Sequence, residues 1–227
     1  MSNDEEFLVY KNLGPDAILD AVESAGFKCD GHVSALNSYE NRVYQIGLED
    51  GSFIVAKFYR PGRWSDDSII EEHAFTAELE EFEIPVVAPL INDGGKSLIH
   101  FDSYRFSLFP RVGGRTPELD NPDHLLQLGH CLARLHNIGA VKPFQHRPVI
   151  NINAYCNEQR HYILENDFIP ADLLPAYESL TTDIIGQIER AFEKAGDLNF
   201  IRLHGDCHLG NILWRDDSPC LVDFDDT

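Results

Sequence analysis

The sequence predicts an α+β protein with two lobes: an antiparallel β-sheet lobe over residues 1–112 and a mostly helical lobe over residues 113–227. Two strand-like runs surround an Asp-Gly pair at residues 50–51, which is a strong hairpin signal. A pair of glycines at residues 113–114 then interrupts the strand pattern. Beyond this joint, leucines recur at helical spacing, and the second lobe is therefore predicted to be helical.

The elements of the first lobe follow from their start and stop signals. Pro15 suits the first position of a helix, and Gly26 suits its end. Ser65 is a candidate N-cap, with Asp66 and Asp67 in the first turn that follows. The lobe is expected to contain, in chain order, a helix at residues 15–25, strands at 43–46 and 53–59, a helix at 65–82 packed on the sheet, and strands near 97–101 and 104–109.

The second lobe is expected to begin with a helix at residues 121–138, where four leucines share one face. Two further helices are predicted at residues 151–164 and 172–195. Short strands are expected at residues 201–203 and 221–222, around the polar segment that carries the candidate chemistry.

Composition limits the classes of function. The 227 residues include 18 Lys and Arg but 38 Asp and Glu, and the formal net charge of −20 argues against a nucleic-acid partner. No apolar run reaches the ~18 residues of a membrane span, and the acidic first six residues do not resemble a signal peptide. The five cysteines are scattered, so neither disulfides nor a zinc knuckle is expected. These features predict a cytoplasmic protein without a membrane partner, and we expect it to be a monomer.

The candidate chemistry lies near the end of the chain, where His204, Asp206 and Asn211 are followed by Asp223. Phosphoryl transfer needs one carboxylate to accept the proton of the attacking hydroxyl. It also needs a carboxylate and an amide oxygen to hold Mg²⁺ against the phosphates. An Asp, an Asn five residues later and a downstream Asp supply these groups. The pair His204 and His208 could suggest zinc, but acidic and amide ligands suit magnesium better, and His204 is expected to anchor the loop by a hydrogen bond.

This segment resembles the protein-kinase-like superfamily, in its aminoglycoside phosphotransferase and choline kinase branch. Residues 204–211 match the catalytic loop of that branch, and Asp223 matches its magnesium aspartate. Protein kinases have Arg where this chain has Gly205, and the third residue of the magnesium motif is Asp225 rather than Gly. Both departures are features of the branch, and the resemblance implies a kinase-like two-lobe fold.

An ATP site is expected upstream of the catalytic loop. A Val-Ala-Lys run ends at Lys57 and resembles the kinase pattern in which a Lys on a rigid strand contacts the α- and β-phosphates. Such a Lys needs a carboxylate from the next helix. Glu72 lies on the apolar stripe of the predicted 65–82 helix, where a carboxylate needs a partner. Glu72 is therefore the predicted partner of Lys57, and Glu71 is the alternative.

The phosphate loop departs from the protein-kinase pattern, because no Gly-x-Gly-x-x-Gly precedes the first hairpin strand. Ser38 can offer a hydroxyl and a backbone N–H to a phosphate, while Asn37 or Asn41 can tolerate a tight turn. A polar hairpin turn is the alternative interpretation of this segment. Adenine needs an apolar slot, which is predicted at residues 109–112, with Val55 as its roof.

Longer stretches resemble the stress response kinase A family of bacteria more closely, and they lie at residues 36–45, 55–61, 110–115 and 203–208. This resemblance implies a Ser/Thr protein kinase that uses ATP and Mg²⁺ and acts in stress survival. It implies that Asp206 is the catalytic base and that Ser38 belongs to the ATP site. It further implies that Asn211 and Asp223 are metal ligands, Asp223 being catalytic as well.

Members of that family continue for on the order of another hundred mostly helical residues, so the helical lobe is expected to be incomplete in this chain. The motifs leave the phosphate acceptor open, because a kinase of aminoglycosides, choline or homoserine uses the same catalytic residues. A third interpretation is a nucleotide-binding fragment without activity.

Overall fold

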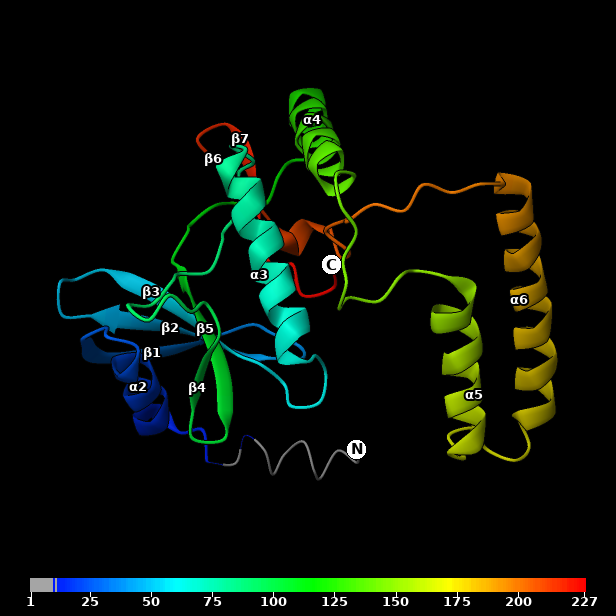
Figure 1. The fold of residues 1–227 in the computed structure, drawn as a ribbon, viewed down its shortest axis with the longest axis horizontal. Helices are drawn as coiled ribbons and strands as arrows, with labels where there is room; N and C mark the ends of the chain where they lie inside the picture. Colours follow the sequence, from blue (N-terminus) through cyan, green and yellow to red (C-terminus); the bar gives the residue numbers. More distant parts are fainter. Residues whose placement is uncertain (1–9, 11) are drawn as a thin grey trace. The chain divides into compact units, whose positions relative to one another are not determined.

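The computed structural model describes residues 10 and 12–227, so the acidic residues that argued against a signal peptide lie outside it. The chain forms two compact units (Figure 1). The larger unit combines the chain up to Val141 with residues 202–227, and the smaller unit comprises residues 142–201. The predicted lobe boundary between residues 112 and 113 stays a prediction. Within the described residues, no helix is both long enough and apolar enough to cross a membrane.

A five-stranded antiparallel sheet forms the core of the larger unit; an antiparallel sheet was predicted, with four of these five strands. The strand order is β1-β2-β3-β5-β4, and every neighbouring pair is antiparallel. The strands are β1 (Cys29–Leu36), β2 (Arg42–Leu48), β3 (Phe53–Phe58), β4 (Ile99–Phe101) and β5 (Tyr104–Pro110). The hairpin predicted at the Asp-Gly pair is the β2–β3 connection. Strand β1 was not expected, because it is an edge strand with a bulge between Cys29 and Val33 and its side chains do not alternate in burial.

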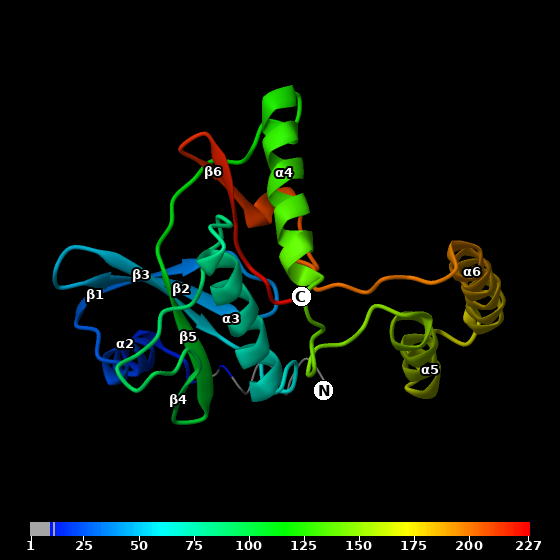
Figure 2. The same cartoon turned by 45° about the horizontal axis from the view of Figure 1, so that its top comes forward.

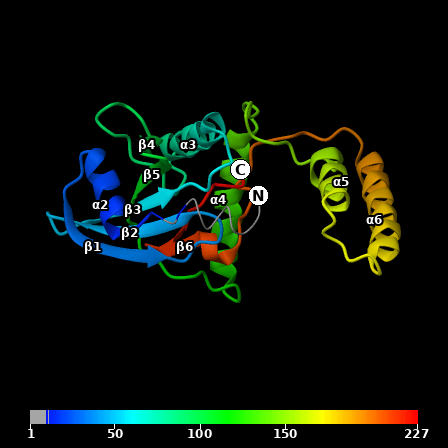
Figure 3. The same ribbon diagram turned by 90° about the horizontal axis from the view of Figure 1, so that it is seen from below.

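Two helices complete this part of the unit, and both were predicted. Helix α2 (Pro15–Ser24) buries Ile18 and Val22 in the core of the sheet, next to β1 (Figures 1 and 3). Helix α3 (Asp66–Glu81) begins at the predicted cap, where the Ser65 side chain accepts a hydrogen bond from the backbone N–H of Ser68 at 3.1 Å. Its buried His73 contacts the hydroxyl of Tyr59, just after β3, and the ring of Phe109 in β5, so α3 packs on the sheet.

Beyond the glycine joint, α4 (Pro122–Gly139) confirms the helix predicted from the leucine spacing. A small hairpin of β6 (Ile212–Arg215) and β7 (Ser218–Leu221) lies beside it, and the ring of Trp214 stacks on His124 of α4 at 3.8 Å (Figure 2). Only the end of β7 was predicted, as part of a strand at residues 221–222. The hairpin turns at two aspartates, Asp216 and Asp217, that both have positive φ, and a proline lies inside β7.

The strand predicted at residues 201–203 is wrong. The backbone N–H of Arg202 donates instead to the carbonyl of Gly139 at the end of α4, at 3.2 Å. The guanidinium of Arg202 donates to the carbonyl of Ile138 at 2.9 Å and forms a 2.7 Å ion pair with Glu78 of α3. Residues 201–203 therefore pair with the end of helix α4 rather than with a strand.

The smaller unit is a pair of helices, as predicted. Its first helix starts with a π-helical turn (Asn153–Asn157) that continues into α5 (Glu158–Glu165), and the second is α6 (Leu174–Ala195). The two lie side by side in each view (Figures 1–3). Arg160 of α5 joins them, because its guanidinium donates to the hydroxyl of Thr181 at 2.7 Å.

Candidate active site

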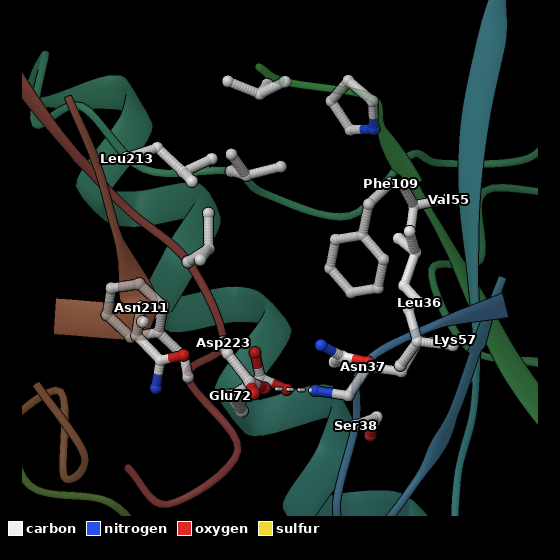
Figure 4. A pocket seen from close by; sticks show the side chains of 17 residues that line it. Leu36, Asn37, Ser38, Val55, Lys57, Glu72, Phe109, Asn211, Leu213 and Asp223 are labelled. Carbon is white, nitrogen blue, oxygen red and sulfur yellow. Dashed lines mark hydrogen bonds and ion pairs between the residues drawn. The ribbon is translucent and has the colours of Figure 1, made fainter. Parts of the chain in front are cut away.

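A cavity of about 260 Å³ lies in the larger unit, between the sheet and the β6–β7 hairpin (Figure 4). Its volume is near the lower end of the range for small-molecule sites. Charged and amide side chains gather at one end of it, and the remaining walls are apolar. The apolar residues are Leu36, Val43, Val55, Val87, Phe109, Pro110, Val112, Leu213, Val222 and Phe224.

Lys57 forms the positive centre of the charged end. It lies late in β3 and is buried, and its Nζ lies 2.7 Å from Oδ1 of Asp223 and 2.9 Å from Oδ1 of Asp225. Burial alone would lower the pKa of Lys57, but the charges of Asp225 and Asp223, with Tyr59 and Glu72, raise it well above its ordinary value. Lys57 is therefore a permanent cation facing the cavity.

Glu72 of α3 lines the same end of the cavity and is only 3% exposed. Its charge is one of those that raise the pKa of Lys57. The alternative, Glu71, is half-buried and lies outside the residues that line the cavity. The structure thus brings Glu72 and Lys57 to one site, while the ion pairs described above join Lys57 to the two aspartates.

The loop from His204 to Asn211 is held by hydrogen bonds at both ring nitrogens of His204. Its Nε2–H donates to the carbonyl of Val222 at 3.0 Å, and its Nδ1 accepts from the backbone N–H of Asp206 at 3.3 Å. Burial lowers the pKa of His204, which matches the neutral ring that this pattern requires. The predicted anchoring role is confirmed by these contacts. The ring also packs on Phe224 with the centroids 4.3 Å apart, which joins the loop to the segment that contains Asp223.

Position 205, just before Asp206, has room only for glycine. Its φ is +82°, in the left-handed region, and a Cβ there would lie 1.8 Å from the backbone O of Asp226. The loop therefore approaches residues 223–226, which we call the aspartate segment, more closely than any side chain allows.

Asn211 and Asp223 both line the cavity (Figure 4). The Nδ2 of Asn211 donates to the backbone O of Asp206 at 3.0 Å and to its Oδ2 at 3.4 Å, which fixes the amide and leaves its oxygen as an acceptor. Asp223 has a φ of +62°, and its carboxylate is half-exposed. A carboxylate and an amide oxygen are hard donors that suit Mg²⁺, so these residues fit such an ion.

Most of the other predicted site residues are also brought to the cavity, but Asp206, the predicted base, is not among the residues that line it. Ser38 and Asn37 lie in the turn between β1 and β2, residues 37–41, which we call the β1–β2 turn. Val55 and Phe109 form part of the apolar wall, as expected for an adenine slot. Arg111 is an exception, because its side chain donates to Gln45 at 3.2 Å on β2.

Two partners in the site were not assigned from the sequence. Asp225, the third residue of the magnesium motif, forms an ion pair with Lys57, and Asn41 donates to the carboxylate of Asp225. Asp225 could have been found, because it lies in the magnesium motif. The contact of Asn41 could not, because its partner lies 184 residues later and no local sequence pattern indicates it.

The fold and the cavity define a kinase-like class of protein, and comparison of sequences agrees. The phosphotransferase enzyme family matches this chain over residues 32–227, and the chain belongs to that family. The α+β fold predicted from the sequence is confirmed by this match and by the structures described below.

The chain is similar to named bacterial kinases. It is 43% identical over 217 residues to stress response kinase A of Escherichia coli strain K12, covering 96% of this chain and 65% of that protein. It is also 43% identical over 224 residues to the serine/threonine protein kinase RdoA of Salmonella typhimurium, covering 99% and 67%. The resemblance found in the sequence is confirmed, and this chain spans about 65% of the length of the first of these relatives.

Two solved structures share the fold. The amicoumacin kinase hAmiN, in complex with AMP-PNP, Ca²⁺ and Ami, matches with a TM-score of 0.71 at 21% identity, over 99% of this chain and 67% of that one. A microcompartment-associated aminopropanol kinase matches with a TM-score of 0.70 at 19% identity, over 93% and 70%.

Proposed function

We propose that this chain carries the nucleotide-binding and catalytic residues of an ATP- and Mg²⁺-dependent phosphotransferase, which transfers the γ-phosphate to a Ser or Thr hydroxyl of a protein. The observation that carries the proposal is the buried Lys57, 2.7 Å from Asp223, at the charged end of a cavity with apolar walls. An apolar slot suits adenine, and a fixed ammonium beside metal-binding oxygens suits phosphates. The protein is further proposed to act as a cytoplasmic monomer.

Each residue has a role in this proposal. Lys57 contacts the nucleotide phosphates, Glu72 supports its charge, and Ser38 offers hydrogen bonds from the β1–β2 turn. Asn211 and Asp223 would hold Mg²⁺, which would supply positive charge that stabilises the phosphoryl oxygens.

Asp206 acts as the base. It accepts the proton of the acceptor hydroxyl as the hydroxyl oxygen bonds to the γ-phosphorus and the bond to ADP breaks. The hydrogen bonds from Asn211 to Asp206 support this role, because they hold the base beside a metal-binding side chain.

The proposed acceptor is supported by the name of one relative at 43% identity, the serine/threonine protein kinase RdoA. A small-molecule acceptor is the second candidate, and the solved structures named for amicoumacin and aminopropanol favour it. A nucleotide-binding part without activity of its own is the third, since the chain spans only 65% of a curated relative.

Calorimetry with Mg·AMP-PNP tests the nucleotide site. Lys57→Met removes one charge-assisted contact and should weaken binding about tenfold or more, whereas Lys96→Met at an exposed turn should leave it unchanged. Equal affinities of wild type and Lys57→Met would refute the assignment of the cavity.

A labelled-ATP assay with generic protein, choline, homoserine and an aminoglycoside in parallel identifies the acceptor. Asp206→Asn should reduce turnover and largely spare nucleotide binding, because it loses only the proton acceptor. If Asp206→Asn keeps wild-type turnover with the preferred acceptor, Asp206 is not the base.

A further inference from the structure

The β1–β2 turn is attached to the aspartate segment by a buried side chain. Asn41, at the end of this turn, is 5% exposed. Its Nδ2 donates to Oδ2 of Asp225, and its Oδ1 accepts from the backbone N–H of Arg60 at 3.1 Å. Both ends of the amide therefore have partners, which fixes its orientation and joins three separate stretches of chain.

Asp225 passes this contact on to Lys57. Its side chain is 12% exposed, and its two oxygens have different partners: Oδ2 accepts from Asn41, while Oδ1 lies 2.9 Å from Nζ of Lys57. Lys57 in turn lies 2.7 Å from Asp223. An unbroken series of contacts thus runs from the β1–β2 turn through Asn41 and Asp225 to the cation of the cavity.

A second link runs beside the first on the surface. Arg63 donates to Glu40 in the β1–β2 turn at 2.9 Å and to Asp226 in the aspartate segment at 3.0 Å. These side chains are partly exposed, and such pairs contribute little to stability. The buried contact of Asn41 is therefore the stronger of the two links.

The amide of Asn41 satisfies the groups on both sides of it, because it donates to Asp225 and accepts from Arg60. A carboxylate there would place a second negative charge against Asp225, and an aliphatic side chain would leave the N–H of Arg60 and one oxygen of Asp225 without this partner. We propose that Asn41 is a positioning residue, which orients Asp225 toward Lys57 and holds the β1–β2 turn on the aspartate segment, so that nucleotide binding depends on it. This inference rests on the proposed nucleotide-binding function.

Asn41→Leu is the first test, because it keeps the volume of the side chain and removes its hydrogen bonds. The affinity for Mg·AMP-PNP should fall roughly tenfold or more, while Asn137→Leu at an exposed position of α4 should change it less than about twofold. Wild-type affinity of Asn41→Leu would overturn the inference.

Hydrogen exchange of the nucleotide-free chain gives a readout that does not depend on ligand. Asn41→Leu should accelerate exchange in both the β1–β2 turn and the aspartate segment, and unchanged exchange in both would overturn the inference. If exchange responds as expected but the wild-type chain binds no nucleotide, the proposed function fails while the link through Asn41 is supported.

Exchanging the two partners separates positioning from a merely structural role. The double variant Asn41→Asp/Asp225→Asn restores an amide–carboxylate pair but removes the charge that faces Lys57. Asn41→Asp alone should lower the unfolding midpoint, and the double variant should recover it while nucleotide affinity stays at least about tenfold below wild type. If affinity recovers together with the midpoint, Asn41 only holds the turn, and its positioning of Asp225 toward Lys57 is refuted.

Discussion

Replacement of Gly139 by Ala tests how the segment before the 204–211 loop is attached to α4. Gly139 is the last residue of this helix, and a Cβ there would lie 2.1 Å from the backbone O of Arg202. The backbone of Arg202 must then move away. This movement weakens the hydrogen bonds that Arg202 donates to Gly139 at 3.2 Å and to Ile138 at 2.9 Å, two residues before His204.

Two opposing effects set the change that Gly139→Ala causes in the free energy of unfolding. Alanine favours a helix over glycine by about 1 kcal/mol. Overpacking costs about 1–3 kcal/mol, and each weakened hydrogen bond costs about 0.5–1.5 kcal/mol. Gly139→Ala should therefore lower the free energy of unfolding by about 1–5 kcal/mol, since two hydrogen bonds are weakened. Gly129 is the matched control in the same helix, because among the described residues nothing lies within 4 Å of its Cβ position, and Gly129→Ala should stabilise by up to ~1 kcal/mol.

Thermal unfolding of the two variants beside wild type is the assay. A change of 1 kcal/mol corresponds to roughly 2–4 °C in a chain of this size, so the two midpoints should move in opposite directions. An equal rise in both midpoints would show that the contact between Gly139 and Arg202 is absent in solution.

The remaining predictions concern single contacts of the larger unit. Burial lowers the pKa of His204 below its ordinary value of 6.5. The stability that depends on its neutral ring should therefore be lost as the pH falls below about 6.5. His204→Asn should flatten the dependence of the unfolding midpoint on pH between about 7.5 and 5. Glu78→Gln removes the charge facing buried Arg202 and should cost about 1.5–3 kcal/mol in chemical unfolding, against less than about 0.5 kcal/mol for exposed Glu80→Gln. Ser65→Ala removes the cap of α3 and should cost about 1 kcal/mol, and an unchanged midpoint would argue against the cap.

Helices were predictable here because their signals are local. Ser65 and Asn121 accept hydrogen bonds at the starts of α3 and α4, as such residues do at helix caps. Strands were harder, because their stability depends on partners elsewhere in the chain. The bulged edge strand β1 and the short β6–β7 hairpin, with a proline in it, were missed for this reason.

The candidate site was likewise predictable from local motifs but not in its contacts between distant residues. Motifs and family resemblance together predicted Ser38, Lys57, Asn211 and Asp223 as site residues, and the structure places all four around one cavity, while Asp206 does not line it. What spacing could not supply is the set of contacts among distant residues. The partners of Lys57 depend on how the aspartate segment packs against β3, and the contact of Asn41 depends on a turn whose flanking strand was itself not predicted.

The contact between Gly139 and Arg202 also determines how the smaller unit is joined to the rest of the chain. The polypeptide leaves the larger unit just after Gly139 and returns at Arg202, and a hydrogen bond closes that gap. Residues 142–201 are therefore an insertion with adjacent ends, and the entropy of closing such a loop grows only slowly with its length. A change in the length of residues 142–201 is therefore expected to cost little loop-closure free energy in the larger unit.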